Sequence, residues 1–230
     1  MALREIGFAN GEIYHIYNQG VDKRLIFKDS DDLNRFVQSM IEFNTLEPIG
    51  SIYENSFVKD KFTLLGRGTS KLVSFINFCL NPNHFHFSLR QESDGGIQKF
   101  MQRLGSGYPK YFNNKYHRKG TLYQGGFKAK HINTNEYLLH LGAYINMNDR
   151  VHKIDSLGRG TSKLIGSWTS LSEYIGGEAG PAQKTFGDIC DSSIILNQFS
   201  SKKEYSCFAK DSLAISLEKK EEKHDLEGWW

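Results

Sequence analysis

Two histidines separated by a single residue, His84 and His86, are the side chains of this chain that most directly suggest chemistry. On a β-strand alternate side chains point to opposite faces, so both imidazoles would project from one face and Phe85 and Phe87 from the other. Two imidazoles on rigid backbone, with the opposite face buried, would supply two ligands of a divalent metal site. The competing interpretation is a surface strand that carries histidine without any ligand role, since the chain has 8 His and surfaces accept this residue freely.

Tyr144 and Asn148 are positioned to complete such a site. We expect a helix that starts near Asn135 and includes both, and a spacing of four residues places them on one helical face. The amide oxygen of Asn148 is a hard ligand, so with His84 and His86 a cation would have three protein ligands and open positions for water and a phosphate oxygen. This arrangement suits phosphodiester cleavage, in which the metal polarises the phosphate and the phenol attacks it.

The phenol of Tyr144 would have to lose its proton to act as a nucleophile. A free tyrosine has a pKa of about 10, so a nearby cation or base is required, and His140 and neighbouring lysines are the candidates. The alternative is structural, because the chain has 11 Tyr and most tyrosines cover the edge of a core with the hydroxyl in water.

Charge is distributed unevenly along the chain. Residues 95–135 contain no Asp or Glu but eight basic residues, so the net charge of +3 leaves −5 for the remainder (+3 minus +8). The eight are Lys99, Arg103, Lys110, Lys115, Arg118, Lys119, Lys128 and Lys130. Aromatic residues interleave with them, and cations beside stacking rings suit single-stranded nucleic acid. The alternatives on charge alone are a solvated basic face and an acidic substrate other than nucleic acid.

Length and composition indicate one globular core with a tail. The three cysteines, Cys79, Cys190 and Cys207, are widely spaced and form no Cys-x-x-Cys pair. This argues against a zinc knuckle or a disulfide framework and favours a reducing cytoplasm. The first residues have no apolar signal core, and no run reaches membrane-spanning length.

Hydrophobic periodicity predicts alternating strands and helices without the long crossovers of a parallel sheet. We therefore expect an α+β sandwich, a mostly antiparallel sheet with helices packed on it. Strands are predicted at 13–18, 57–65, 73–80, 84–90, 121–124 and 127–132, and helices at 29–43, 97–112 and from 133–135 onward. A polar helical segment after Asp188 leads into a charged run at 216–225, which we expect to fray.

One octapeptide occurs twice, as LGRGTSKL at 65–72 and again at 157–164. The flanking residues differ, so this is not a repeat architecture. The spacing to its lysine is too short for a phosphate-binding P-loop.

Several ordered blocks resemble one known family. They are GEIYHIYNQGV at 11–21, LNPNHFHF at 80–87, GTLYQGGFK at 120–128, YINMN at 144–148 and WTSLSEY at 168–174. Over most of residues 8–212 the chain resembles the REP-associated tyrosine transposases, within the larger group of HUH single-strand endonucleases and insertion-sequence transposases. Asp149 departs from a usual proline, and Gly126 from a common arginine.

The resemblance implies a ferredoxin-like catalytic domain over residues 8–187, with inserted loops near 65–72 and 157–164. A helical extension and charged tail would follow at 188–230. His84, His86 and Asn148 would hold Mg²⁺ or Mn²⁺. Tyr144 would attack single-stranded DNA that carries a hairpin or palindromic repeat, stay linked to its 5′ end and free a 3′ hydroxyl.

The protein implied by the resemblance is cytoplasmic, bacterial and nucleoid-associated, a monomer or homodimer, and it acts on single-stranded or hairpin DNA without a membrane. A module of the same fold that binds hairpin DNA but has lost its chemistry is the alternative. A nucleotide hydrolase with alternating histidines would require a third histidine where Ser88 stands.

Overall fold

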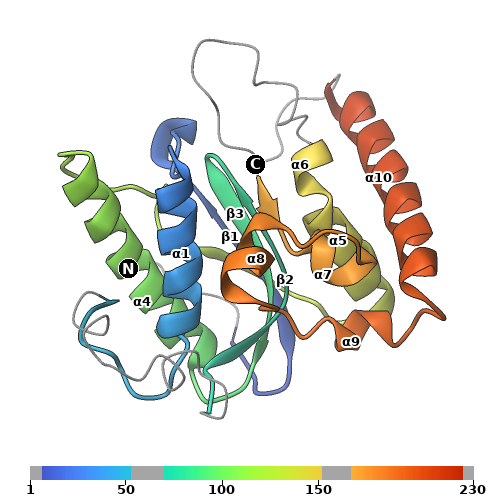
Figure 1. Ribbon diagram of the computed structural model, residues 1–230, viewed down its shortest axis with the longest axis horizontal. Coiled ribbons are helices and arrows are strands. Elements are labelled where there is room, and N and C mark those ends of the chain that lie inside the picture. Colours follow the sequence, from blue (N-terminus) through green and yellow to red (C-terminus); the bar gives the residue numbers. More distant parts are fainter. Residues whose placement is uncertain (1–6, 53–69, 152–166, 225–230) are drawn as a thin grey trace.

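A five-stranded sheet lies between two layers of helices (Figure 1). The computed structural model describes residues 7–52, 70–151 and 167–224, with side chains described as far as Glu218. The strand order is β4-β1-β3-β2-β5, and every neighbouring pair is antiparallel. The strands are β1 (Ile13–Gln19), β2 (Val73–Asn81), β3 (His84–Gln91), β4 (Lys128–His131) and β5 (Trp168–Thr169).

The first four strands follow the ferredoxin-like β-α-β-β-α-β succession. One long helix lies between β1 and β2, another between β3 and β4, and β2 and β3 form a hairpin. The predicted α+β fold, an antiparallel sheet with helices packed on it, is confirmed. The short strand β5 adds a fifth member beside β2.

Helices α1 (Ser30–Glu42) and α4 (Gly96–Lys115) cover one face of the sheet (Figure 1). The Asp29 side chain accepts a hydrogen bond from the Asp32 backbone N–H and so caps α1. A short 3-10 helix, η1 (Val21–Lys23), follows β1. The buried ring of Phe36 in α1 lies 5.4 Å from Phe85, which joins α1 to β3 in one apolar cluster.

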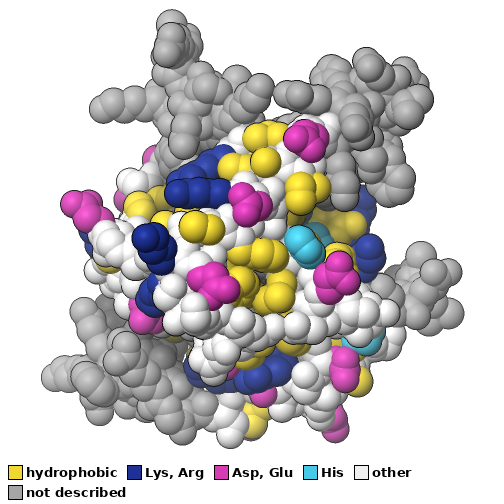
Figure 2. Space-filling view, turned by 90° about the vertical axis from the view of Figure 1, so that its right-hand side faces the viewer, with side chains coloured by type: hydrophobic (Ala, Val, Ile, Leu, Met, Phe, Trp, Pro, Cys, Tyr) yellow, Lys and Arg dark blue, Asp and Glu magenta, His cyan; other side chains and the backbone are white. Residues whose placement is uncertain are grey.

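The opposite face is covered mainly by α5 (Asn135–Asn146), against which α10 (Lys202–His224) packs. Short helices complete this half of the chain: α6 (Asn148–Val151), α7 (Leu171–Ile175), α8 (Pro181–Phe186) and α9 (Ser193–Leu196). At Gly142 an added Cβ would lie 2.7 Å from the Ile195 side chain and 3.1 Å from Asn77 Nδ2. Glycine therefore lets α5 approach β2 closely. On the outer surface of α10, acidic, basic and hydrophobic side chains are mixed (Figure 2).

The hairpin of β2 and β3 separates apolar from polar side chains. Phe85 and Phe87 of β3 are buried against α1 and α4, as alternation along a strand requires. A bulge at Ile76 shifts the register of β2, so that Phe75 and Phe78 both reach the same apolar cluster. The remaining face of the hairpin, with both histidines, is turned toward α5.

Most of the expected elements are present, with three corrections. The predicted strand at 121–124 is reduced to a single bridge between Tyr123 and Gly20, because glycines at 120, 125 and 126 interrupt it. The helix expected to run through Asn148 is interrupted at Met147. The charged run expected to fray is helical as far as His224.

Some predictions concern residues outside the described part of the chain. They are the strand at 57–65, the second octapeptide and all of the first except residues 70–72. None of the helices in the described residues is long and apolar enough to cross a membrane. The domain boundary at 187/188 stays a prediction.

Lys115 lies in a charged cluster between α4 and the start of α1. Its Nζ is 2.6 Å and 2.7 Å from the two Asp29 carboxylate oxygens and 3.0 Å from Asp32 Oδ1. Asp32 is completely buried and also accepts a hydrogen bond of 2.8 Å from the Tyr116 hydroxyl. Lys115 therefore neutralises a buried carboxylate, a structural role that competes with contact to DNA.

Lys115→Met is expected to lower the free energy of unfolding by about 2–3 kcal/mol, because it leaves a buried carboxylate without its cation. Urea denaturation at neutral pH measures this change. Lys110→Met, on an exposed position of the same helix, is the control and should change stability by less than about 0.5 kcal/mol. Equal stability of the two variants would contradict the assigned role.

Candidate metal and tyrosine site

The four residues singled out as candidates meet on the α5 side of the sheet. The ring centroids of His84 and His86 are 5.1 Å apart, and those of His86 and Tyr144 are 6.1 Å apart and nearly perpendicular. His84 Nε2 lies 3.3 Å from Asn148 Oδ1. The tertiary structure thus brings a phenol, two imidazoles and an amide oxygen from separate elements into one small volume. Their catalytic roles stay predictions.

A break in the helix places Asn148. Helix α5 ends at Asn146, Met147 has φ −114° and ψ 16°, and α6 starts at Asn148. The Met147 N–H still bonds to the Ala143 carbonyl at 3.0 Å, so the chain keeps its direction and Asn148 remains beside Tyr144. The amide of Asn148 is buried and turned toward the β2–β3 hairpin.

Hydrogen bonds determine which nitrogen of His84 carries the proton. Its Nδ1 donates to Asn83 Oδ1 at 2.7 Å, and Asn83 in turn donates through Nδ2 to the Lys23 carbonyl. Burial lowers the pKa of His84 to about 4, with the Asn148 side chain acting in the opposite direction. The ring is therefore neutral at pH 7 with its proton on Nδ1, so Nε2 is the unprotonated nitrogen.

Asn81, the last residue of β2, connects the candidate ligands His84 and Asn148. Its Nδ2 donates to Asn148 Oδ1 at 2.5 Å and to His84 Nε2 at 2.8 Å. Its Oδ1 accepts from Ser167 at 2.6 Å, which fixes the orientation of the amide. Since a carbonyl oxygen has two lone pairs, Asn148 Oδ1 keeps one for a further partner.

Tyr144 is half-buried and not ionised at neutral pH. Burial raises its pKa to about 12, and the nearby Asn148 side chain acts in the opposite direction. Asn148 Nδ2 is buried and has no hydrogen-bond partner at standard geometry among the described residues. This N–H group would be able to stabilise negative charge on the phenol oxygen, but the phenol alone is a poor nucleophile at pH 7.

His15 of β1 also lies at the site, although the sequence alone did not indicate a role for it. Its Nε2 lies 2.9 Å from His86 Nδ1, and the two buried rings stack with centroids 5.2 Å apart. Burial, followed by the charge of Lys130, lowers the pKa of His15 to about 3. The alternation of side chains along β1 indicates that Ile13, His15 and Tyr17 share one strand face. No local pattern indicates that β3 is the strand beside them.

His140, proposed as an activator of Tyr144, contacts Ser212 of α10 at 3.3 Å.

The donor atoms fit a divalent cation. Within the described residues, no three His, Cys, Asp or Glu side chains form a metal-binding group, so a cation held by His84 and His86 would need an amide oxygen such as that of Asn148. Two imidazoles and an amide oxygen suit Mn²⁺, and Mg²⁺ with added waters. The set has no carboxylate, so a phosphate of the substrate would add negative charge and increase the affinity for the ion.

The eight basic residues do not form one surface. Lys99 and Lys110 are exposed on α4, and Lys119 is exposed in the loop after it. Arg103 donates to the carbonyls of Phe43, Thr45 and Leu46, Arg118 donates to Asn113, and Lys115 is in its carboxylate cluster. Lys128 and Lys130 pair with Tyr17 and His15 across β4 and β1, so they share the sheet face of His86. A DNA contact stays a prediction for all eight.

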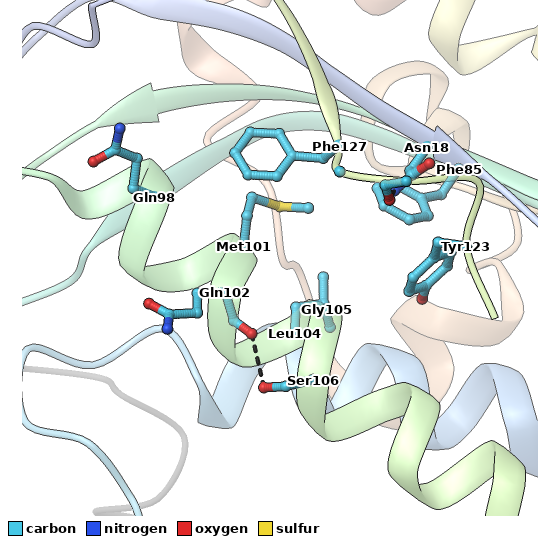
Figure 3. Close-up of a pocket in the computed structure, with 12 residues that line it drawn as sticks. Asn18, Phe85, Gln98, Met101, Gln102, Leu104, Gly105, Ser106, Tyr123 and Phe127 are labelled. Atoms are coloured by element: carbon cyan, nitrogen blue, oxygen red, sulfur yellow. Dashed lines mark hydrogen bonds between the residues drawn. The ribbon is translucent and has the colours of Figure 1, made fainter. Parts of the chain in front are cut away.

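A cavity of about 290 Å³ lies between α4 and the segment before β4 (Figure 3). Apolar side chains including Phe85, Met101 and Phe127 line it. Phe85 is adjacent to His86 in β3, and Asn18 is adjacent to Tyr17 in β1, so their side chains point to the opposite face of the sheet. The cavity is therefore on the other side of the sheet from the candidate site.

Comparison with known proteins finds a family model and a solved structure that are similar to parts of this chain. No curated protein matches the chain. A solved structure described as the REP-associated tyrosine transposase bound to a REP hairpin overlaps with it at 13% identity and a TM-score of 0.45, covering 66% of this chain and 74% of that one. Residues 63–148 match the family model described as "Transposase IS200 like". The matched segment contains the histidine pair and Tyr144 and ends at Asn148.

Proposed function

We propose that this protein is a metal-dependent enzyme that nicks and joins single-stranded DNA at hairpin or palindromic repeats, with Tyr144 as the nucleophile. The observation that carries the proposal is the convergence of Tyr144, His86 and Asn148 across elements that are distant in sequence. The family match supports a transposase in general, and the chemistry at these residues is our assignment.

His84 Nε2, Asn148 Oδ1 and a ring nitrogen of His86 would hold Mg²⁺ or Mn²⁺. When bound, the cation would polarise the scissile phosphate and supply the positive charge that a phenol with a pKa of about 12 needs to react near neutrality. The Asn148 amide N–H would stabilise developing negative charge on the Tyr144 oxygen.

The bonds exchanged follow from a phenol as nucleophile. The Tyr144 oxygen forms a bond to phosphorus as the bond from phosphorus to the 3′ oxygen breaks. The phenolic proton leaves to water and the departing oxygen takes one up, so a 3′ hydroxyl is freed and the 5′ phosphate stays on tyrosine. Attack by a second 3′ hydroxyl reverses these bond changes and joins the new strand.

Lys128 and Lys130 are the basic residues best placed to hold DNA at this site. They are exposed on the edge strand β4, and each has its Nζ near a tyrosine ring: 5.9 Å from Tyr17 for Lys128 and 4.9 Å from Tyr137 for Lys130. Cations next to aromatic rings suit single-stranded DNA, because the cations bind its phosphates and the rings stack on its bases. The mixed charges of the α10 surface (Figure 2) offer less attraction to a polyanion.

A labelled hairpin oligonucleotide with single-stranded flanks, incubated with the protein and Mn²⁺, tests the proposal. We expect a protein–DNA adduct that resists denaturing electrophoresis and carries the label only when it lies on the 3′ side of the cleaved phosphate. Tight hairpin binding without any adduct would instead support the alternative, a binding module whose chemistry is lost.

A further inference from the structure

The second imidazole of the proposed metal site has a dedicated partner on the neighbouring strand. In the β1–β3 register Tyr17 faces His86 and His15 faces Ser88, so His15 is the diagonal neighbour of His86 on the same sheet face. The two rings are nearly parallel, with an angle of 18° between their planes. Nε2 of His15 lies 2.9 Å from Nδ1 of His86, and the two residues are only 6% and 2% exposed.

A single proton has to lie between these two nitrogens. If His15 Nε2 donated it, a neutral His86 would carry its own proton on Nε2 and have no lone pair for a cation. If His86 Nδ1 donates it, Nε2 of a neutral His86 is unprotonated and carries the lone pair that a cation requires. Only the second arrangement is compatible with His86 as a ligand.

We propose that His15 is a positioning residue that accepts the Nδ1–H of His86, and so holds the ring and its Nε2 lone pair in place for the cation. This inference rests on the proposed metal-dependent function. Asn83 makes the corresponding contact to His84, accepting from Nδ1 at 2.7 Å. Both imidazoles would then present Nε2 and be oriented through Nδ1, the usual arrangement of metal-ligating histidine.

The position of His15 explains why an imidazole is used here. Its ring centroid lies 4.8 Å from that of Tyr17 and 5.2 Å from that of His86, and the Tyr17 and His86 centroids are 5.8 Å apart, so the three rings pack together in a triangle. A planar ring packs against both neighbours, and its nitrogen supplies the acceptor. A branched apolar residue would fill part of the space but leave the buried N–H of His86 without a partner, which costs free energy and lets the ring rotate.

Mn²⁺ affinity of the full chain tests the inference without recourse to activity. Free Mn²⁺ is measured by electron paramagnetic resonance during titration of wild type, His15→Leu and His15→Gln. Loss of a residue that hydrogen-bonds to a metal ligand lowers metal affinity by about 10- to 100-fold. We expect a decrease of this size for His15→Leu. His15→Gln keeps an acceptor near the same position and should stay within about threefold. His140→Leu, which removes a histidine that contacts α10, should bind as wild type does.

Nitrogen NMR of the wild-type imidazoles gives a second readout that needs no variant to fold. We expect the proton of metal-free His86 on Nδ1, and a proton on Nε2 would overturn the inference. Wild-type affinity in a folded His15→Leu variant, or equal weakening in His15→Leu and His15→Gln, would also overturn it and leave the proposed function standing. A wild-type protein that binds no Mn²⁺ would remove the metal site itself and the inference with it.

Discussion

Tyr144→Phe is expected to abolish the covalent adduct and to lower the rate of strand cleavage by at least about 10³-fold, since a nucleophile is irreplaceable in a covalent mechanism. The substitution removes one oxygen from a half-buried ring and leaves the packing of α5 intact. Affinity for the hairpin should therefore stay within about threefold of wild type. Single-turnover cleavage of a labelled hairpin and equilibrium binding to it measure the two quantities separately.

Tyr137→Phe is the matched control for this prediction. Tyr137 is on the same helix, two turns before Tyr144, and its ring lies 4.9 Å from Lys130 Nζ. Loss of its hydroxyl should leave adduct formation unchanged. If Tyr144→Phe still formed an adduct while Tyr137→Phe did not, the nucleophile would have been assigned to the wrong tyrosine of α5.

Asn148→Leu should have the second largest effect, because it replaces the only proposed oxygen ligand with an apolar group of similar size. We expect Mn²⁺ affinity to fall by at least about tenfold and cleavage by about 10²- to 10³-fold, with activity partly restored at high Mn²⁺. The restoration follows from mass action, since two imidazole ligands remain. Cleavage rates over a range of Mn²⁺ concentrations separate the loss of metal from a loss of folding.

Asn146→Leu provides the contrast, two residues earlier in the chain. Asn146 is also fully buried, but it donates to the Tyr205 hydroxyl at 2.7 Å and accepts from Ser170 at 2.7 Å. Its replacement should lower the free energy of unfolding by about 1–3 kcal/mol and leave Mn²⁺ affinity unchanged at a temperature where the protein is folded. Loss of Mn²⁺ affinity in Asn146→Leu and not in Asn148→Leu would refute the assigned ligand.

Local patterns in the sequence were sufficient for much of the fold. Alternation in β3 predicted that His84 and His86 share a face. Hydrophobic periodicity predicted strands at 73–80 and 84–90 and a helix at 29–43, where β2, β3 and α1 lie. Each of these features depends on neighbours within a few residues, which is why the amino-acid order alone determines them.

Long-range contacts required the tertiary structure. Lys115 was grouped with possible DNA contacts, yet Asp29 and Asp32 neutralise it across more than 80 residues. The break at Met147, which turns Asn148 toward the hairpin, has no strong local signal because neither glycine nor proline is present there.

The chain's sequence by itself determined the chemistry that is available: two imidazoles on one strand face, a phenol and an amide near a late helix, and their order along the chain. Only the tertiary structure decided how those groups are oriented. His15 and His86 are 71 residues apart in sequence, and strand register alone brings their nitrogens into contact. Register depends on how the whole sheet buries its apolar face, so the partner of a ligand is a property of the folded molecule and not of any short segment.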